Sequence, residues 1–173
     1  DEIAELLNLK KEISEITVLT MQGKLCFNES IKKRVQLLKG VNICSFEKIV
    51  NEKIKFQPHV NEWLNYAKSH NLVTVVVNTF EVLNNELTGN LVGEIINADK
   101  KAELTVKIAN QYGIKKNQII AIGDGANDIN MFQESGLSIS MHGKPVLDDF
   151  VTWSVKKNYY KTILDLFIFL EKE

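Results

Sequence analysis

The sequence lacks an excess of charge of either sign, and it lacks long apolar runs. Its 173 residues include 21 Lys and Arg against 22 Asp and Glu, for a formal net charge of −1. This balance argues against nucleic acid or an anionic membrane as a partner, because both favour a basic face. No apolar run reaches the roughly 18 residues of a membrane span, and no signal peptide opens the chain. We therefore expect a cytoplasmic protein.

Cysteine is scarce as well, with only Cys26 and Cys44. Neither has His or Cys neighbours at metal-ligand spacing, which argues against a zinc site or a disulfide. We expect both to be small, buried apolar residues. With 45% hydrophobic residues, the chain is long enough for one good core and a small second lobe.

The pattern of the chain changes near residue 56. Residues 1–55 predict helices over "EIAELL", over "KEISEITVLTMQ" ended by Gly23, and over "ESIKKRVQLLKG" with Asn28 as N-cap and Gly40 as stop. Beyond Pro58, strands alternate with helices, which predicts an α/β fold with a parallel sheet covered by helices. The predicted strands are "VTVVV" (73–77), 119–122, "LSISM" and "FVTWSV"; a hairpin turns at Asn84-Asn85; the helices are "HVNEWLNYAKSH", "KKAELTVKIANQYG", 128–135 ended by Gly136, and one through Leu170.

The segment "IIAIGDGANDINMF" places two carboxylates directly after a buried strand. Gly123 and Gly125 allow a tight turn around Asp124, and Asn127-Asp128 opens a helix whose N–H groups favour anions. A carboxylate beside an anion site is best explained by a cation, and Mg²⁺ binds one or two carboxylates together with phosphate oxygens. The alternative is that Asp124 and Asp128 are only a turn former and an N-cap.

"GDGANDINMF", preceded by the helix that bears Lys101, resembles the last signature segment of the haloacid dehalogenase superfamily, and specifically of its phosphoserine phosphatase family. The segments "TMQGKLCFNESIKKRVQLLKG", "NTFEVLNNELTGNLVGEI", "KAELTVKIANQYGI" and "GLSISMHGKPVL" extend the resemblance. It implies a Rossmann-like parallel sheet core at 56–173 with a small helical cap at 1–55. It also implies a Mg²⁺-dependent phosphomonoester hydrolase that converts L-phosphoserine to L-serine and phosphate, the last step of serine biosynthesis, through an aspartyl-phosphate.

The resemblance assigns roles to five core residues. Asp124 would bind Mg²⁺, and Lys101, starting its helix, would pair with the phosphoryl oxygens and the nucleophile. Asn127, together with Gly125, would contact the substrate phosphate. Asp128 would support the catalytic centre or bind the metal weakly.

Three cap residues receive roles in the same way. Arg34 matches the residue that grips the substrate carboxylate, for which a planar bidentate donor is suited. Met21 and Phe27 match the apolar lining around the serine portion. From pattern alone, Met21 and Phe27 could instead be cap core and Arg34 a solvated charge. Lys100 competes with Lys101, although the register of "KAEL" favours Lys101.

Two family signatures are absent from the sequence. No Asp-x-Asp occurs, although the resemblance implies that its first Asp attacks phosphorus and its second is the general acid and base. No Ser-Gly-Gly occurs either, and "AKSH" runs into "NLVTVVVNTFEV", which resembles a segment about twenty residues further on.

We expect these segments to belong to the protein. A chain break would then lie within 68–74, and an open slot beside 119–122 would face Asp124 and Lys101. The alternatives are a related phosphatase for another phosphomonoester, or a truncated, inactive remnant that acts as a binding module. If 73–77 is itself the missing strand, Thr79 becomes the phosphate ligand.

Overall fold

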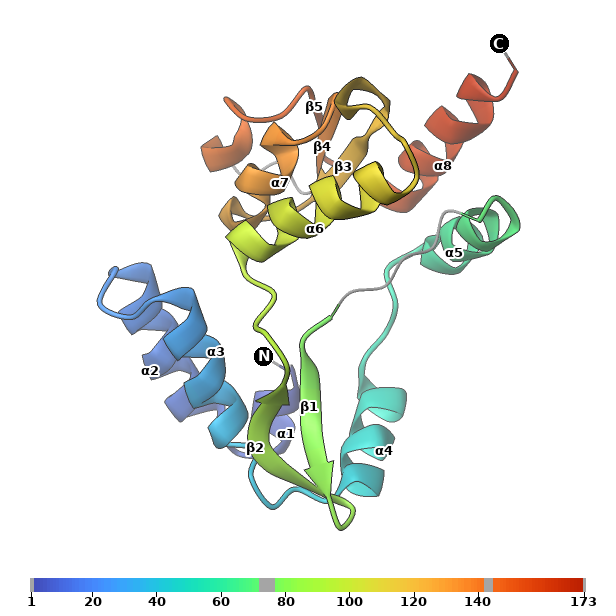
Figure 1. The fold of residues 1–173 in the computed structure, drawn as a ribbon. Helices are drawn as coiled ribbons and strands as arrows, with labels where there is room; N and C mark the ends of the chain where they lie inside the picture. The colour runs from blue at the N-terminus through green and yellow to red at the C-terminus, as the bar shows by residue number, and fades with distance from the viewer. Residues whose placement is uncertain (1, 72–76, 142–144, 173) are drawn as a thin grey trace. The chain divides into compact units, whose positions relative to one another are not determined.

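The computed structural model describes residues 2–71, 77–141 and 145–172 (Figure 1). The chain forms two compact units: Asp1–Lys55 with Val76–Ile95, and Phe56–Val75 with Ile96–Glu173. We refer to them as the helical unit and the sheet unit. Among the described residues, no helix combines the length and hydropathy needed to cross a bilayer.

Four helices build most of the helical unit: α1 (Glu2–Leu6), α2 (Lys10–Met21), α3 (Phe27–Gln36) and α4 (Ile43–Lys53). The first three match predicted segments, and Gly23 and Gly40 have the positive φ angles of 71° and 82° expected after helix ends. The fourth was not predicted. Asn42 caps it by accepting hydrogen bonds from the Cys44 and Ser45 N–H groups at 3.0 and 3.4 Å.

The start of α3 differs from the prediction. Its N-cap is Cys26 and not Asn28, because the Cys26 Sγ accepts the Glu29 N–H while the Glu29 carboxylate accepts the Cys26 N–H at 3.1 Å. This reciprocal pair satisfies two helix-end donors. The expectation of buried cysteines was also wrong, since both are exposed. Cys26 serves the helix end, and Cys44 lies two residues from the buried Phe46, on another side of α4.

A hairpin completes the helical unit. Strands β1 (Thr79–Leu83) and β2 (Glu86–Val92) pair antiparallel around Asn84-Asn85, whose φ angles of 51° and 63° are those of a type I′ turn. The predicted hairpin is therefore confirmed. We assigned it to the core at 56–173, whereas it packs with the helices, because Leu87 is buried in one cluster with Leu38 and Phe46.

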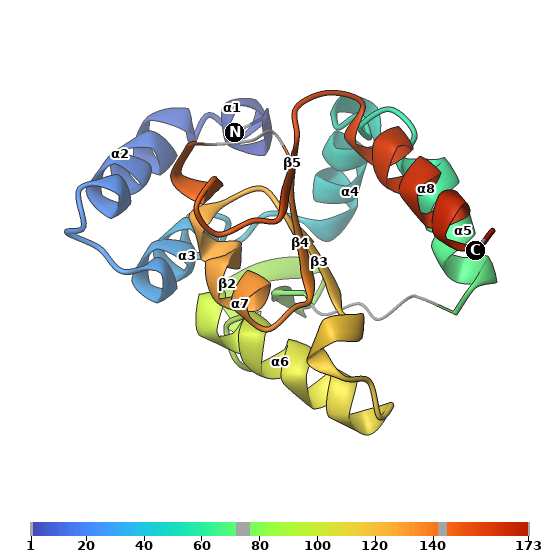
Figure 2. The same cartoon turned by 90° about the horizontal axis from the view of Figure 1, so that it is seen from above.

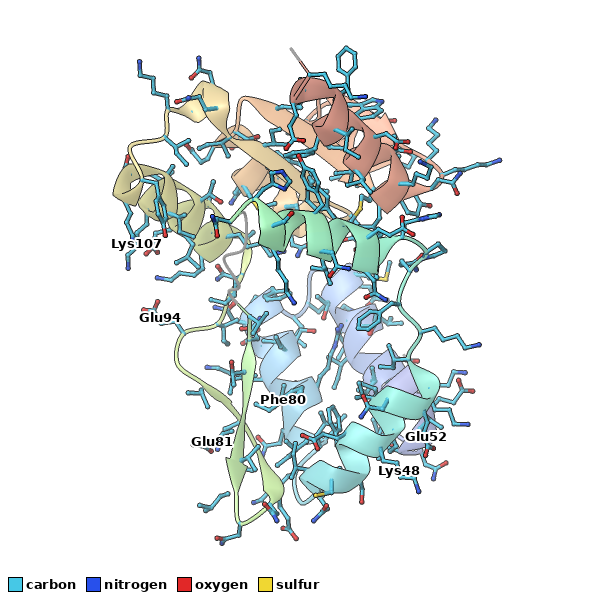
Figure 3. All side chains as sticks on the ribbon, turned by 90° about the vertical axis from the view of Figure 1, so that its right-hand side faces the viewer. Lys48, Glu52, Phe80, Glu81, Glu94 and Lys107 are labelled. Atoms are coloured by element: carbon cyan, nitrogen blue, oxygen red, sulfur yellow. The ribbon has the colours of Figure 1, made fainter. Side chains whose placement is uncertain are left out.

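The pairing of the hairpin shifts between Phe80 and Val82. At this bulge the Glu81 carboxylate accepts hydrogen bonds from Thr88 Oγ1 and Asn90 Nδ2, which lower the pKa of Glu81. Figure 3 shows Phe80 and Glu81 on opposite sides of β1, as the two-residue period of a strand requires.

The sheet unit contains the parallel strands β3 (Ile120–Gly123), β4 (Leu137–Met141) and β5 (Trp153–Val155), in that order. Its helices are α5 (Val60–Ser69), α6 (Ala98–Gln111), α7 (Ile129–Gln133) and α8 (Tyr159–Leu170), with short 3₁₀ turns at Lys116–Gln118, Ala126–Asp128 and Pro145–Leu147. Figure 2 shows α7 and α8 on opposite sides of the sheet. The predicted α/β fold is confirmed.

Hydroxyl groups join β4 to the segment of β5. Ser140, fully buried, donates to Ser154 Oγ at 3.0 Å, and the Thr152 N–H donates to Ser138 Oγ at 3.0 Å. Ile139 lies between the two serines in sequence and is also fully buried. One face of β4 is therefore polar and satisfied within the sheet, while the other is apolar.

Helices α5 and α8 pack through aromatic rings and one carboxylate. Trp63 and Phe167 meet edge to face with centroids 5.0 Å apart. The Tyr66 hydroxyl donates to Glu171, and His70 Nε2 lies 2.8 Å from Glu171 Oε1. The Glu171 carboxylate at the end of α8 thus contacts both Tyr66 of α5 and His70, the C-terminal cap of α5.

The expected strand 73–77 and the expected break within 68–74 fall largely outside the described residues. Within the described strands, β3 pairs with β4 only, which leaves its other edge without a described partner. Thr79 lies at the start of β1, paired with Val92 in the hairpin.

A titration tests the α5–α8 contact. The hydrogen bond from Tyr66 to Glu171 is the main cause that raises the pKa of Tyr66 from 10.0 to about 12. Because the folded-state pKa is the higher one, the stabilisation is complete below pH 10 and is lost as the pH rises towards 12. Spectrophotometric titration should show one of the four tyrosines ionising late. Glu171→Ala should abolish that late step, and Lys172→Ala should leave it; identical curves for all three proteins would disprove the assignment.

Candidate active site

The candidate site lies where β3 ends and the chain turns into α7. Ala121 and Gly123 are buried, and the loop Gly123–Gly125 leads through the 3₁₀ turn Ala126–Asp128 into the helix. Ligands of open parallel sheets bind at this carboxyl edge of the strands. The loop therefore occupies the position at which an α/β fold presents functional groups.

The Asp128 carboxylate fixes the conformation of this loop. Its Oδ2 accepts the N–H groups of Asp124 and Gly125 at 3.0 and 3.2 Å, and the side chain is only 5% exposed. Charge-assisted hydrogen bonds of this kind are among the stronger ones in proteins. We expected the N–H groups here to favour an external anion, and two of the loop N–H groups instead bind the chain's own carboxylate.

Lys101 pairs with the other oxygen of Asp128. Its Nζ lies 2.6 Å from Asp128 Oδ1, and the Lys101 side chain is 28% exposed. An ammonium group has three donors, and Asp128 accepts one of them. Lys100, the competing residue, forms its ion pair with Glu103 on α6 at 2.8 Å. The geometry therefore brings Lys101 to the loop.

Two contacts that the sequence analysis missed position Lys101. Asn97 caps α6 by accepting the Lys100 N–H at 2.9 Å, and Asn130 Nδ2 donates to Asp99 Oδ1 at 2.7 Å, which joins α7 to α6. The Asn97 cap had a local signal, because Asn before a helical segment is a preferred start. The second contact spans 31 residues and had none.

The glycines of the loop permit close packing. A Cβ on Gly123 would lie 2.5 Å from the Asp128 carboxyl carbon, and a Cβ on Gly125 would lie 2.5 Å from Asn127 Oδ1. Neither distance is compatible with a side chain unless the neighbour moves. Gly123 is therefore needed for the approach of Asp128 rather than for an unusual φ angle.

Asp124 and Asn127 are exposed, in contrast to Asp128. Within the described part of the chain, the Asp124 carboxylate accepts no hydrogen bond, and no group of three or more His, Cys, Asp or Glu could hold a metal. Mg²⁺ usually keeps several waters and binds one or two carboxylates and phosphate oxygens. The exposed Asp124 carboxylate is the kind of oxygen group that such an ion binds.

The predicted cap residues lie in the helical unit and do not form one group. The Arg34 Nη2 donates to Thr17 Oγ1 at 3.2 Å, and Arg34 lines a cavity of that unit. Met21 and Phe27 are 84% and 40% exposed, and neither lines this cavity. The five predicted residues of the sheet unit thus meet at one loop: Lys101, Asp124, Gly125, Asn127 and Asp128.

Proteins described as phosphoserine phosphatases are similar in sequence to most of this chain. A phosphoserine phosphatase of Methanocaldococcus jannaschii is 33% identical over 186 residues, covering 95% of this chain and 88% of the relative. One from Archaeoglobus fulgidus is 32% identical over 91% of this chain, which spans 52% of that relative. Because 95% of 173 residues is about 164, about 22 of the 186 aligned positions in the first comparison have no counterpart here.

Solved structures give the same result. A phospho-aspartyl intermediate analogue of phosphoserine phosphatase is 31% identical, with a TM-score of 0.79 over 95% of this chain and 89% of that one. A probable phosphoserine phosphatase from Vibrio cholerae is 28% identical, with a TM-score of 0.75, and this chain spans 55% of it. The family model of the haloacid dehalogenase-like hydrolases matches residues 2–165. The resemblance seen in the sequence is confirmed: the chain belongs to the haloacid dehalogenase-like hydrolase family, and these relatives are phosphoserine phosphatases.

Proposed function

We propose that the protein hydrolyses phosphomonoesters at the β3 loop and that its substrate is L-phosphoserine, which yields L-serine and phosphate. The observation that carries the proposal is the Lys101–Asp128 pair at the end of β3, in a chain 33% identical to a phosphoserine phosphatase. We also propose that this reaction is the last step of serine biosynthesis.

Each polar residue of the loop has a role in this proposal. Charge is spread over the phosphoryl oxygens during transfer, and Lys101 donates to them with the N–H groups that Asp128 leaves available. Asp128 holds the ammonium and the loop in one arrangement, which makes it a positioning residue. Asn127 donates from its exposed amide to the same phosphate, and Gly125 lets the chain approach it closely.

The charge balance supports a divalent cation. Lys101 contributes one positive charge, while Asp124 and Asp128 contribute two negative ones, so this group alone repels a phosphate dianion. We propose that Asp124 binds Mg²⁺, with the remaining ligands from water and phosphate oxygens. When bound, the ion neutralises charge on the phosphoryl group.

The nucleophile is a separate question, because the sequence contains no Asp-x-Asp. The family resemblance implies an aspartyl-phosphate intermediate. The proposed hydrolysis therefore requires a protein that includes the nucleophilic Asp of the Asp-x-Asp signature. A chain without it would bind phosphoserine at the loop and release no phosphate, which is the binding-module alternative. Hydrolysis of another phosphomonoester is the second alternative.

Phosphate release measures the function and the role of Arg34 together. We expect faster release from L-phosphoserine than from phosphoethanolamine, which lacks the carboxylate. Arg34→Ala should lower kcat/KM for phosphoserine by an amount equivalent to a loss of about 2 to 4 kcal/mol of transition-state binding. The same variant should lower kcat/KM for phosphoethanolamine much less. Equal losses on both substrates would refute the carboxylate contact, and release from neither would favour the binding module.

Asp124→Asn tests the metal ligand. The substitution keeps the shape and weakens one hard oxygen ligand on the exposed side of the loop, so Mg²⁺-dependent release should fall at least about a hundredfold while the fold remains. Phosphate release against Mg²⁺ concentration, with circular dichroism as the fold control, gives the answer. Wild-type activity in the variant would exclude Asp124 as a ligand.

Asp128→Asn tests the positioning residue. The variant leaves the Lys101 ammonium without its partner and weakens two loop hydrogen bonds, so unfolding should require about 2 kcal/mol less free energy. Asp165→Asn is the matched control, because it breaks the exposed Lys161–Asp165 pair of α8 and should change stability by less than about 0.5 kcal/mol. Urea unfolding of both variants compares them; equal effects would contradict the role given to Asp128.

A further inference from the structure

A second cavity of the helical unit, of about 460 Å³, lies between α3, the hairpin and the residues that follow β2. We refer to it as the hairpin cavity. It adjoins the cavity of Arg34, because Val35 and Leu91 line both, but Arg34 does not line it. Phe80 lines the Arg34 cavity and Glu81 the hairpin cavity, in agreement with their places on opposite sides of β1 (Figure 3).

The walls of the hairpin cavity combine polar and apolar side chains. Lys32 and Gln36 come from α3, and Glu81 and Asn90 come from the two strands of the hairpin. Its volume lies within the range of about 300 to 1,000 Å³ found for small-molecule sites, which join an apolar lining to a few polar groups. A ligand that matches these walls therefore has both charged and hydrocarbon parts.

The Glu81 carboxylate has one oxygen in use and one available. Both of its hydrogen bonds, from Thr88 Oγ1 and from Asn90 Nδ2, are accepted by Oε2. Within the described residues, Oε1 accepts none. The two donors lower the pKa of Glu81, so the carboxylate is ionised at neutral pH. The bulge of the hairpin thus provides a negative charge with an unused acceptor on the wall of the cavity.

Lys32 contributes the opposite charge from α3. Along the parts of the chain that the structure describes, its ammonium forms neither a hydrogen bond nor an ion pair, and it does not pair with Glu81. Glu29, one turn earlier on α3, directs its carboxylate to the Cys26 N–H instead. A lysine has a flexible stem and three donors, so Lys32 can place its ammonium on a ligand.

We propose that the hairpin cavity binds a free amino acid with an aliphatic side chain. The ammonium group of the ligand donates to Glu81 Oε1, and its carboxylate accepts from Lys32. Its hydrocarbon chain lies against the apolar side chains Val35, Leu91 and Ile95. Two opposite charges on the protein balance the two on this ligand. A phosphate dianion would instead place excess negative charge beside Glu81, so the cavity is not a second phosphomonoester site.

Titration calorimetry on the whole chain tests the site with L-norvaline and with two probes of the same carbon number, sodium pentanoate and pentylamine. Norvaline carries both charges, whereas each probe carries one and leaves either Glu81 or Lys32 unpaired. We expect saturable binding of norvaline, with each single-charge probe weaker by roughly tenfold or more. Binding is measured without substrate turnover, so a failure of the proposed phosphatase activity and a failure of this site are separate results.

Charge variants locate the binding. Lys32→Met and Glu81→Gln each remove one charge and keep most of the side chain, so each should weaken norvaline binding by roughly tenfold. Lys33→Met and Glu86→Gln are the matched controls, because they remove like charges from the same helix and hairpin at residues that do not line the cavity. Neither control should change the affinity.

Three results would overturn the proposal. One is the absence of saturable norvaline binding, and another is equal affinity for norvaline and the single-charge probes. The third is norvaline binding that survives Lys32→Met and is lost in Arg34→Met, which would place the ligand in the Arg34 cavity. Because Lys32 is exposed, Lys32→Met tests the site even if Glu81→Gln, which alters the bulge, fails to fold.

Discussion

The buried carboxylate of Asp128 accepts three hydrogen bonds, two from loop N–H groups and one from the Lys101 ammonium. The donors come from two parts of the site, the loop and α6, so one side chain sets both the path of the loop after β3 and the position of the Lys101 ammonium. Gly123 has to lack a side chain for this approach. The exposed Asp124 and Asn127 then take their positions from a loop that they do not themselves hold.

Local features of the fold could be predicted because their causes are local. Asn84-Asn85 predicted the hairpin, since Asn tolerates the left-handed φ angles of a type I′ turn. Alternating strand and helix segments predicted the sheet unit. The start of α3 at Cys26 could not be predicted in the same way, because its cap depends on a reciprocal contact with Glu29 and cysteine is not a favoured N-cap residue. The hairpin's attachment to the helices depends on Leu87, whose burial only the tertiary structure reveals.

The candidate site shows the same difference between local features, which could be predicted, and long-range contacts, which could not. The loop residues are contiguous in sequence, so their grouping followed from the motif. The role of Asp128 did not follow, because a pattern of letters does not say which donors its two oxygens accept, and Lys101 is 27 residues away. Arg34 illustrates the opposite difficulty: only the family resemblance suggested a carboxylate contact, and its apolar surroundings come from several helices and the hairpin and are visible only in the folded unit.

The hydroxyl groups between β4 and β5 have a consequence for how the strands find each other. Ser140 meets Ser154, and Ser138 meets Thr152, only when the two segments are aligned as observed. A shift of one residue would turn Ile139 towards these polar groups and leave buried hydroxyls without partners. Apolar contacts tolerate small displacements, whereas paired hydroxyls do not. The polar face of β4 therefore favours one alignment of the two segments over its neighbours by the free energy of its paired hydroxyls.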